Sequence, residues 1–167
     1  MTNDDMIFLG IFGTMALLLL LWGLWTFYIE PKLCERAINK YFPDFYHCLE
    51  TYKILYNTRE KIADEKKKTQ SAIDRLTKEL RYFEVGSKDY AILCTSICKL
   101  KKQYNALYNE YHFKDYVFKG YKEEFKNYYS FVTFSWINDD KIKEKEWTLW
   151  DILRRHRGIK KKIISFQ

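Results

Sequence analysis

The chain contains few residues that interrupt helices. Only two prolines and six glycines occur among its 167 residues. Because glycine and proline are the strongest local signals for turns, their scarcity argues against a sheet with many short connections. The sequence therefore predicts an all-α protein built from long helices.

Cysteine is also scarce, with four residues in the whole chain. This number is too small for the disulfide framework of a secreted domain, and it agrees with an intracellular body. The spacing of Cys94 and Cys98 places both on one helical face, but no further ligand is expected to converge on them. His47, His112 and His156 are scattered and lack the i, i+4 pairing of a helical metal motif. We expect free thiols, no metal site and no cofactor.

Recognisable catalytic patterns are missing as well. The sequence contains no Gly-rich phosphate loop, no nucleophile elbow and no catalytic pattern of paired carboxylates. Its acidic residues are mixed with lysines, as in residues 64–68, which is typical of a solvated helix face. We predict that the protein is not an enzyme.

Charge is absent from residues 6–29, a run of 24 residues. As a helix this run would extend about 36 Å, enough to cross a hydrocarbon core of about 30 Å with some tilt. A secretory signal peptide is disfavoured because residues 1–5 hold no Lys or Arg, and no small-residue cleavage pattern follows. We predict one transmembrane helix, with three aromatic anchors at its C-terminal interface: Trp22, Trp25 and Tyr28.

The flanking charges predict the orientation of this helix. No Lys or Arg precedes it, whereas Lys32, Arg36 and Lys40 follow closely. The positive-inside rule then leaves residues 1–5 as a short non-cytoplasmic stub. The body is expected in the cytoplasm for a bacterial inner membrane, or in the matrix for a mitochondrial inner membrane.

Residues 44–128 carry two heptad-like runs. Positions alternately three and four apart are mostly apolar from Phe45 to Phe83, and again from Tyr90 to Tyr128. Such spacing predicts two helices that pack along a left-handed, coiled-coil-like seam. Between the runs, residues 84–87 suit a turn, because Gly86 can adopt positive φ and Ser87 can cap the following helix. We therefore predict an antiparallel helical hairpin.

A short joint, residues 30–43, connects the predicted span to the hairpin. Pro31 suits the first turn of a helix, and the residue before Pro43 should avoid helical dihedral angles. Pro43 is interpreted either as an elbow between two helices or as a kink within one continuous helix.

Residues 129–167 have an aromatic and basic composition that suits a membrane interface. Residues 129–137 are uncharged and aromatic but too short to span a bilayer. An amphipathic stretch follows, with nine Lys or Arg against three acids in residues 141–167. The candidate interface residues of this short basic C-terminal helix are Trp147, Trp150, Arg154, Arg155, Arg157, Lys160, Lys161 and Lys162.

Three interpretations of the basic tail are open. The first is binding to anionic lipid, to which each cation near the surface would contribute about 1 kcal/mol. The second is binding to nucleic acid phosphates, which lacks any accompanying recognition motif. The third is a solvated terminus whose tryptophans pack on the base of the hairpin. Lipid is favoured over nucleic acid because the anchor already holds the chain near a membrane.

The predicted seam contains cations around its middle. Antiparallel pairing would place Arg59 opposite residues 111–114, so that cations share a layer with an aromatic ring. Additional carboxylates would then come from a third helix or another subunit. Two helices alone are also expected to leave a wide aromatic surface exposed: Tyr104, Tyr108, Tyr111, Phe113, Phe118 and Phe125. The candidate partner-binding residues are Arg59, Lys66, Tyr104, Tyr108, Tyr111, Lys114 and Phe118, although snorkelling of the cations to solvent explains them equally well.

Two short segments, residues 27–33 (FYIEPKL) and 59–63 (REKIA), resemble the juxtamembrane and early stalk segments of one family. That family is the b-type peripheral-stalk subunit of rotary ATP synthases, and the resemblance implies a membrane-anchored stalk. The break at Gly86 and the aromatic returning arm depart from the single continuous stalk of that family.

Taken together, these patterns favour a structural or accessory subunit of a membrane-embedded complex, in which an anchored hairpin docks other subunits. An alternative of a different class is a membrane-tethered sensor or effector that acts by self-association. A divergent peripheral-stalk subunit is a third possibility.

Overall fold

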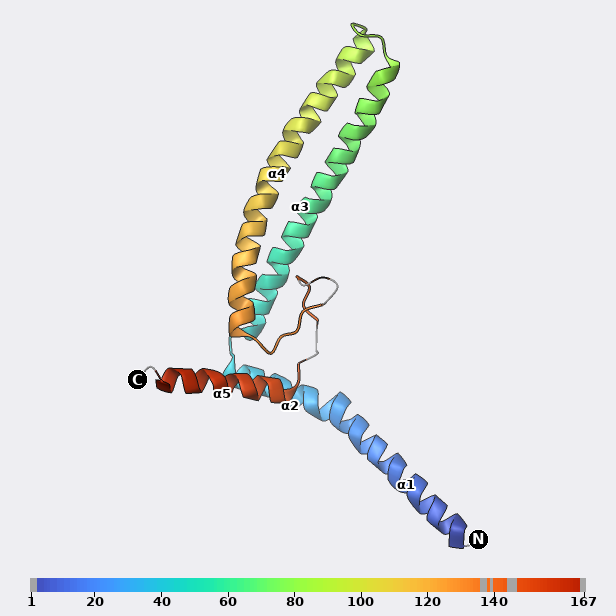
Figure 1. The fold of residues 1–167 in the computed structure, drawn as a ribbon, viewed down its shortest axis with the longest axis vertical. Coiled ribbons are helices and arrows are strands. Elements are labelled where there is room, and N and C mark those ends of the chain that lie inside the picture. The colour runs from blue at the N-terminus through green and yellow to red at the C-terminus, as the bar shows by residue number, and fades with distance from the viewer. Residues whose placement is uncertain (1–2, 136–137, 139, 144–146, 166–167) are drawn as a thin grey trace. The chain divides into compact units, whose positions relative to one another are not determined.

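The protein is all-helical (Figure 1). The computed structural model describes the backbone of residues 3–135, 138, 140–143 and 147–165, and the side chains of residues 11–135, 138, 140–143 and 147–160. Two compact units divide the chain. The first unit comprises Met1–Tyr46 and Tyr129–Gln167, and the second comprises His47–Tyr128.

The N-terminal helix of the first unit is long and apolar. It begins as α1 (Asn3–Leu24), passes through a π-helical turn (Trp25–Ile29) and continues as α2 (Glu30–Tyr41). The wider turn lies directly before Pro31, whose ring crowds the carbonyl of Phe27 and which has no N–H to donate. Among the described residues, one helix, Ile11–Tyr41, is long and apolar enough to cross a membrane by length and composition.

Helical geometry ends at the residue before Pro43. Phe42 has φ −139° and ψ 63°, and the next helix, α3, begins at Phe45. The steric restriction that a proline places on its predecessor accounts for this break. Pro43 therefore separates two helices rather than kinking one.

An aromatic cluster forms the core of the first unit. The Phe45 ring lies 5.1 Å from Tyr129, 5.3 Å from Phe131 and 5.6 Å from Trp147, measured between ring centroids. Phe42 joins the cluster through Phe131 at 5.2 Å. The segment after Tyr128 was expected to face a membrane interface, but Tyr129 and Phe131 are each only 4% exposed. The two rings are buried inside the protein, because neighbouring rings of the same unit cover them.

The C-terminal helix, α5 (Leu149–Ser165), starts later than residue 141, where the amphipathic pattern begins. Before it, Phe134 and Ile142 form an isolated antiparallel bridge. Thr148 and Asp151 then cap α5 reciprocally: Thr148 Oγ1 accepts from the Asp151 amide at 3.3 Å, and Asp151 Oδ2 accepts from the Thr148 amide at 3.3 Å. This capping box determines where the helix begins.

Helix α5 packs against α2 within the first unit. Ile38 of α2 and Ile152 of α5 are almost completely buried. Tyr41 stacks on His156 with 4.1 Å between ring centroids. Within the described part of α5, the side that carries Ile152 and His156 is thus covered by α2, whereas Trp150 is exposed.

The second unit contains α3 (Phe45–Glu79) from His47 onward, a 3-10 turn (Leu80–Tyr82) and α4 (Lys88–Tyr128). In the connection between the 3-10 turn and α4, Gly86 has φ +96°, a backbone conformation that residues with a Cβ rarely adopt. Ser87 Oγ accepts from the Tyr90 amide at 3.2 Å and so caps α4. Both features agree with the turn chemistry predicted for residues 84–87.

Helices α3 and α4 lie side by side (Figure 1), and early residues of α3 contact late residues of α4. Tyr52 packs 5.2 Å from both Phe118 and Phe125 between ring centroids. The Tyr121 hydroxyl donates to the carbonyl of Cys48 at 2.9 Å. From Cys48 to Leu80 and from Tyr90 to Phe125, the heptad positions are all buried or half-buried.

The expectation that two helices would leave Phe118 and Phe125 exposed is wrong. Phe118 is 0% exposed and Phe125 is 3% exposed. Tyr52, itself 1% exposed, fills the space between them. Two other side chains of α3 also cover Phe118: the Tyr56 ring lies 6.0 Å from it between centroids, and the Arg59 guanidinium lies 4.4 Å from its centre.

Candidate interaction surfaces

The seven predicted partner-binding residues differ in how far they are exposed to solvent. Arg59 and Phe118 are buried between α3 and α4, and Tyr108 is 45% exposed. The other four are half-buried: Lys66, Tyr104, Tyr111 and Lys114. Their role in binding a partner stays a prediction, but most of this set contributes to the contact between the two helices.

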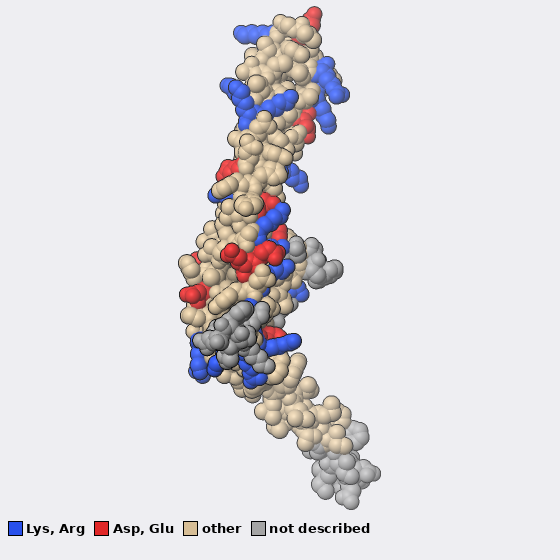
Figure 2. All heavy atoms as spheres, turned by 60° about the vertical axis from the view of Figure 1, so that its left-hand side comes forward, with Lys and Arg blue, Asp and Glu red and all other residues tan. Residues whose placement is uncertain are grey.

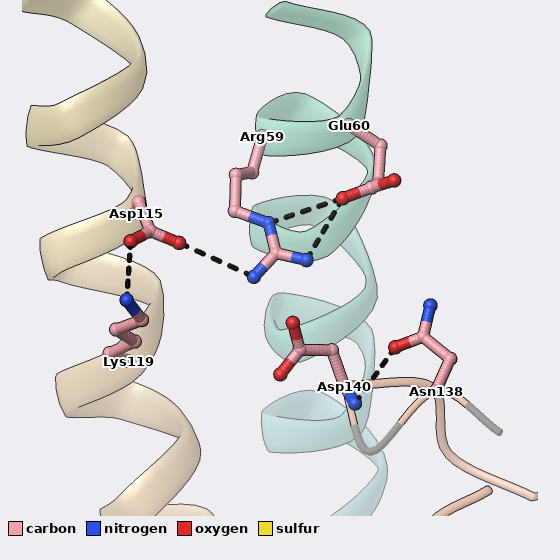
Figure 3. A network of polar contacts seen from close by, with 6 residues as sticks. All are labelled: Arg59, Glu60, Asp115, Lys119, Asn138 and Asp140. Carbon is pink, nitrogen blue, oxygen red and sulfur yellow. Dashed lines mark hydrogen bonds and ion pairs between the residues drawn. The ribbon is translucent and has the colours of Figure 1, made fainter. Parts of the chain in front are cut away.

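Arg59 is the centre of a charged network (Figure 3). Its Nη2 lies 2.9 Å from Glu60 Oε1, and its Nη1 lies 3.5 Å from Asp115 Oδ1. Asp115 also accepts from Lys119 Nζ at 2.7 Å, and this hydrogen bond raises the pKa of Lys119. The guanidinium lies 4.4 Å from the centre of the Phe118 ring. Hydrogen-bonded carboxylates are the usual condition for burying a guanidinium, and here α3 and α4 themselves supply them.

This network corrects the predicted register. Arg59 was expected opposite residues 111–114, but it contacts Asp115 and Phe118, about one turn further along α4. It was also expected to need carboxylates from a third helix. Asp115 does not occupy a heptad position, so the apolar pattern alone gave no signal for this partner.

Lys66 occupies the aromatic layer that was predicted for the seam. Its Nζ lies 4.3 Å from the centre of the Tyr111 ring and 5.6 Å from that of Tyr108. Attraction between an ammonium group and the ring face stabilises a cation that α3 directs toward α4. Tyr108 also contacts His112 of the same helix, at 4.3 Å between ring centroids.

A second aromatic surface lies on the side of α4 that faces away from α3. Phe113 is 63% exposed, Tyr116 is 79% exposed and Val117 is 37% exposed. Three small or polar residues lie on the same side of the helix and are exposed as well. We call this surface the outer face of α4, formed by Ala106, Asn109, Phe113, Tyr116, Val117 and Gly120.

The outer face has a heptad spacing of its own. Residues 106, 109, 113, 116 and 120 are alternately three and four positions apart, which places them along one stripe of a helix. Tyr116 was not among the predicted partner residues. The signal in the sequence was this second, offset series.

Gly120 is unusual in the outer face. A Cβ added there would meet nothing within 4 Å, so no contact within the described structure requires a glycine. Glycine in a helix interior is destabilising by about 0.5–1 kcal/mol relative to alanine. The residue therefore leaves a site where another chain could approach the backbone closely.

Charge is distributed unevenly around the outer face. Lys99 and Lys102 precede it on α4, and Glu123 and Glu124 follow it, all four exposed. Between these flanks the side chains that form the outer face are uncharged, and the exposed Glu110 lies beside them. Figure 2 shows Lys and Arg side chains near the end of the helix pair that carries the turn, and both cationic and acidic side chains further along it.

The predicted membrane-interface residues lie in the first unit. Trp22, Trp25 and Tyr28 are all exposed, and Lys32 Nζ lies 4.0 Å from the centre of the Tyr28 ring. Trp147 precedes α5 and is half-buried in the aromatic cluster, whereas Trp150 is exposed.

The cations of α5 form the other part of this set. Arg154, Arg157 and Lys160 are exposed, and Arg155 is half-buried. Arg157 lies over the ring of Trp150, 6.0 Å from its centre. The side chains of Lys161 and Lys162 lie outside the described residues.

Titratable groups do not converge on a metal site in the part of the chain that the structure describes. No three His, Cys, Asp or Glu side chains there could hold one ion. Burial, together with the hydrogen bond to Cys48, raises the pKa of Tyr121 to about 12. This phenol is a structural donor at neutral pH.

No protein-family model, curated protein or solved structure matches the chain. The resemblance to b-type stalk subunits therefore depends only on residues 27–33 and 59–63. The long α3 and α4 helices are also interrupted at the 3-10 turn (Leu80–Tyr82) and Gly86, where a continuous stalk would remain helical.

Proposed function

We propose that the protein is a structural or accessory subunit of a membrane-embedded multiprotein complex. The N-terminal apolar helix anchors the chain, and α3 and α4 act as a rigid antiparallel hairpin with a coiled-coil-like seam. The outer face of α4 docks other subunits. The positive flank at Lys32, Arg36 and Lys40 favours a body in the bacterial cytoplasm or the mitochondrial matrix, with the N-terminus on the other side.

The observation that carries this proposal is the pairing of a membrane-length apolar helix with an exposed aromatic face on a second unit. Large aromatic residues that are exposed and grouped together are typical of protein interaction surfaces. Phe113 and Tyr116 have rigid side chains with few rotatable bonds, so binding a partner would restrict little conformational freedom. The uncharged centre between charged flanks resembles the apolar core and polar rim of an interface.

The contacts between α3 and α4 make this pair of helices rigid. Tyr52, Phe118 and Phe125 interlock, and the network around Arg59 adds charged hydrogen bonds between the same two helices. A docking face on such a pair holds its shape before the partner arrives.

We also propose that α5 binds anionic lipid through Arg154, Arg157 and Lys160. These cations are exposed while the side of α5 that carries Ile152 and His156 is covered by α2, the continuation of the apolar helix. Such an arrangement supports electrostatic attraction to headgroups without deep insertion of α5.

The experiment that tests the docking function is capture of the tagged full-length chain in mild detergent, followed by mass spectrometry. The variant Phe113→Asp combined with Tyr116→Ser should lose at least one co-purifying membrane protein. A matched control is Tyr82→Ser, which removes another exposed ring, 88% exposed, away from the outer face.

Comparison of the two variants distinguishes specific docking from non-specific binding to exposed aromatic rings. If the outer-face variant and the Tyr82 control lose the same proteins, or neither loses any, the outer face is not the docking surface. Circular dichroism of each purified variant should give the wild-type helical content, because all three residues are exposed.

A further inference from the structure

The outer face of α4 has a pattern of size and charge that is complementary to itself. Phe113 lies midway between Ala106 and Gly120, and the lysine and glutamate flanks lie on opposite sides of it. Antiparallel pairing about Phe113 would set residue 106 against residue 120 and residue 102 against residue 124. Small residues then face small residues, and Lys102 faces Glu124.

We propose that a second copy of this chain docks on the outer face, with the two α4 helices antiparallel about a two-fold axis at Phe113. The contact is isologous, because each copy presents the same patch to the other. This inference rests on the proposed function, since it names one partner for the outer face.

The charges favour the antiparallel arrangement over a parallel one. Parallel pairing would place Lys102 beside its own copy and Glu124 beside its own copy, and like charges in contact oppose association. Antiparallel pairing converts both repulsions into two equivalent Lys102–Glu124 attractions. Such rim pairs act mainly on orientation and partner choice.

This arrangement explains why position 120 is a glycine. The space around Gly120 is open in the single chain, whereas opposite Ala106 of a second copy it permits close approach of the two helices. Phe113 and Tyr116 can then reach across the interface on either side of the small residues. In a soluble unit, burying two rings from each copy supplies the hydrophobic driving force.

The two-fold axis also predicts a spacing. Tyr128 ends α4 fifteen residues beyond Phe113, so the C-terminal ends of the paired helices would be about 45 Å apart along the helix axis, at 1.5 Å per residue. A parallel pair would bring these ends together.

Sedimentation of the full-length chain in mild detergent, over a range of protein concentrations, tests the proposal. The wild type should dimerise, and Phe113→Asp should abolish dimerisation. Lys102→Glu should weaken the dimer by on the order of tenfold at low salt, because two attractions become repulsions. The combined variant Lys102→Glu with Glu124→Lys should restore wild-type affinity, and Lys67→Glu on α3 should have no effect.

Several results would overturn the second-copy proposal. They are a monomeric wild type, a dimer that survives Phe113→Asp, and a double variant no tighter than Lys102→Glu alone. Because α1 could also associate in detergent, the Phe113→Asp result assigns the contact to α4.

The two proposals fail in different ways. If the wild type is monomeric but outer-face variants still lose captured proteins, the second copy is wrong and the docking function stands. If the dimer behaves as expected but no other protein is captured, the accessory-subunit function is wrong and the second copy stands.

Discussion

The two faces of α4 are built from similar residues but have opposite surroundings. On the inner face, Phe118 is 0% exposed and contacts Tyr52 of α3. On the outer face, Phe113 is 63% exposed although it lies only five residues away. The comparison shows that aromatic content alone does not determine which residues hold this unit together. The position of each ring relative to α3 determines whether the ring contributes to holding the unit together.

Replacing one phenylalanine on each face is the strongest way to sharpen this comparison. Phe118→Ala should destabilise the α3–α4 unit by about 3–5 kcal/mol, because it removes a buried ring and leaves a cavity beside Tyr52. At a protein concentration low enough for the chain to be monomeric, Phe113→Ala should change stability by no more than about 0.5 kcal/mol. Chemical denaturation of the full chain in detergent, followed by circular dichroism, measures both.

Equal losses for Phe118→Ala and Phe113→Ala would contradict the distinction between the faces. They would mean that the outer face is buried in the state being measured, for example in a dimer. Repeating the measurement at low protein concentration separates these cases.

Charge provides a second test of the inner face. Asp115→Ala should destabilise the unit by about 1–3 kcal/mol, because Arg59 is 5% exposed and would lose one of its hydrogen-bonded carboxylates. Asp64→Ala, which removes an exposed carboxylate from α3, should have an effect within about 0.5 kcal/mol. The same denaturation measurement applies.

A result for Asp115→Ala as small as that for Asp64→Ala would show that Arg59 does not depend on α4. A double-mutant cycle with Arg59→Leu would then give no interaction energy between residues 59 and 115.

The smallest expected effect concerns pH. The pKa of Tyr121 is raised to about 12 in the folded chain, above the value near 10 of an unfolded tyrosine. Folding therefore favours the neutral phenol, and its contribution is fully present below pH 10 and lost as the pH rises through about 12. Tyr121→Phe should cost about 0.5–1.5 kcal/mol at neutral pH, through the lost hydrogen bond to Cys48.

The difference in unfolding free energy between wild type and Tyr121→Phe, measured from pH 8 to pH 12, isolates this group from the titrating lysines. That difference should shrink above about pH 10. A difference that stays constant over this range would show that Tyr121 is not tied to the inner face.

Local features of the fold could be read from the sequence because their causes lie within one or two helical turns. The positive φ of Gly86, the cap at Ser87 and the break before Pro43 each depend on neighbouring residues only. The heptad spacing likewise identified which side of α3 and α4 is removed from solvent.

The candidate site was harder to predict, because its features depend on residues far apart in the chain. Asp115 lies outside the apolar register, so its contact with Arg59 required the actual offset between the helices. Tyr129 and Phe131 have an interfacial composition, yet the rings of Phe42 and Phe45 cover them. The capping box at Thr148 was overlooked, which moved the expected start of α5.

By itself, the sequence determined the helical character of the protein, the apolar run long enough to cross a membrane, and the position of the turn at Gly86. These follow from backbone preferences and hydrophobic spacing, which act locally. Only the tertiary structure decided which aromatic rings are buried, which carboxylate neutralises Arg59 and which face of α4 remains open. Burial depends on the neighbour that supplies the covering atoms, and that neighbour is identified only when distant segments meet.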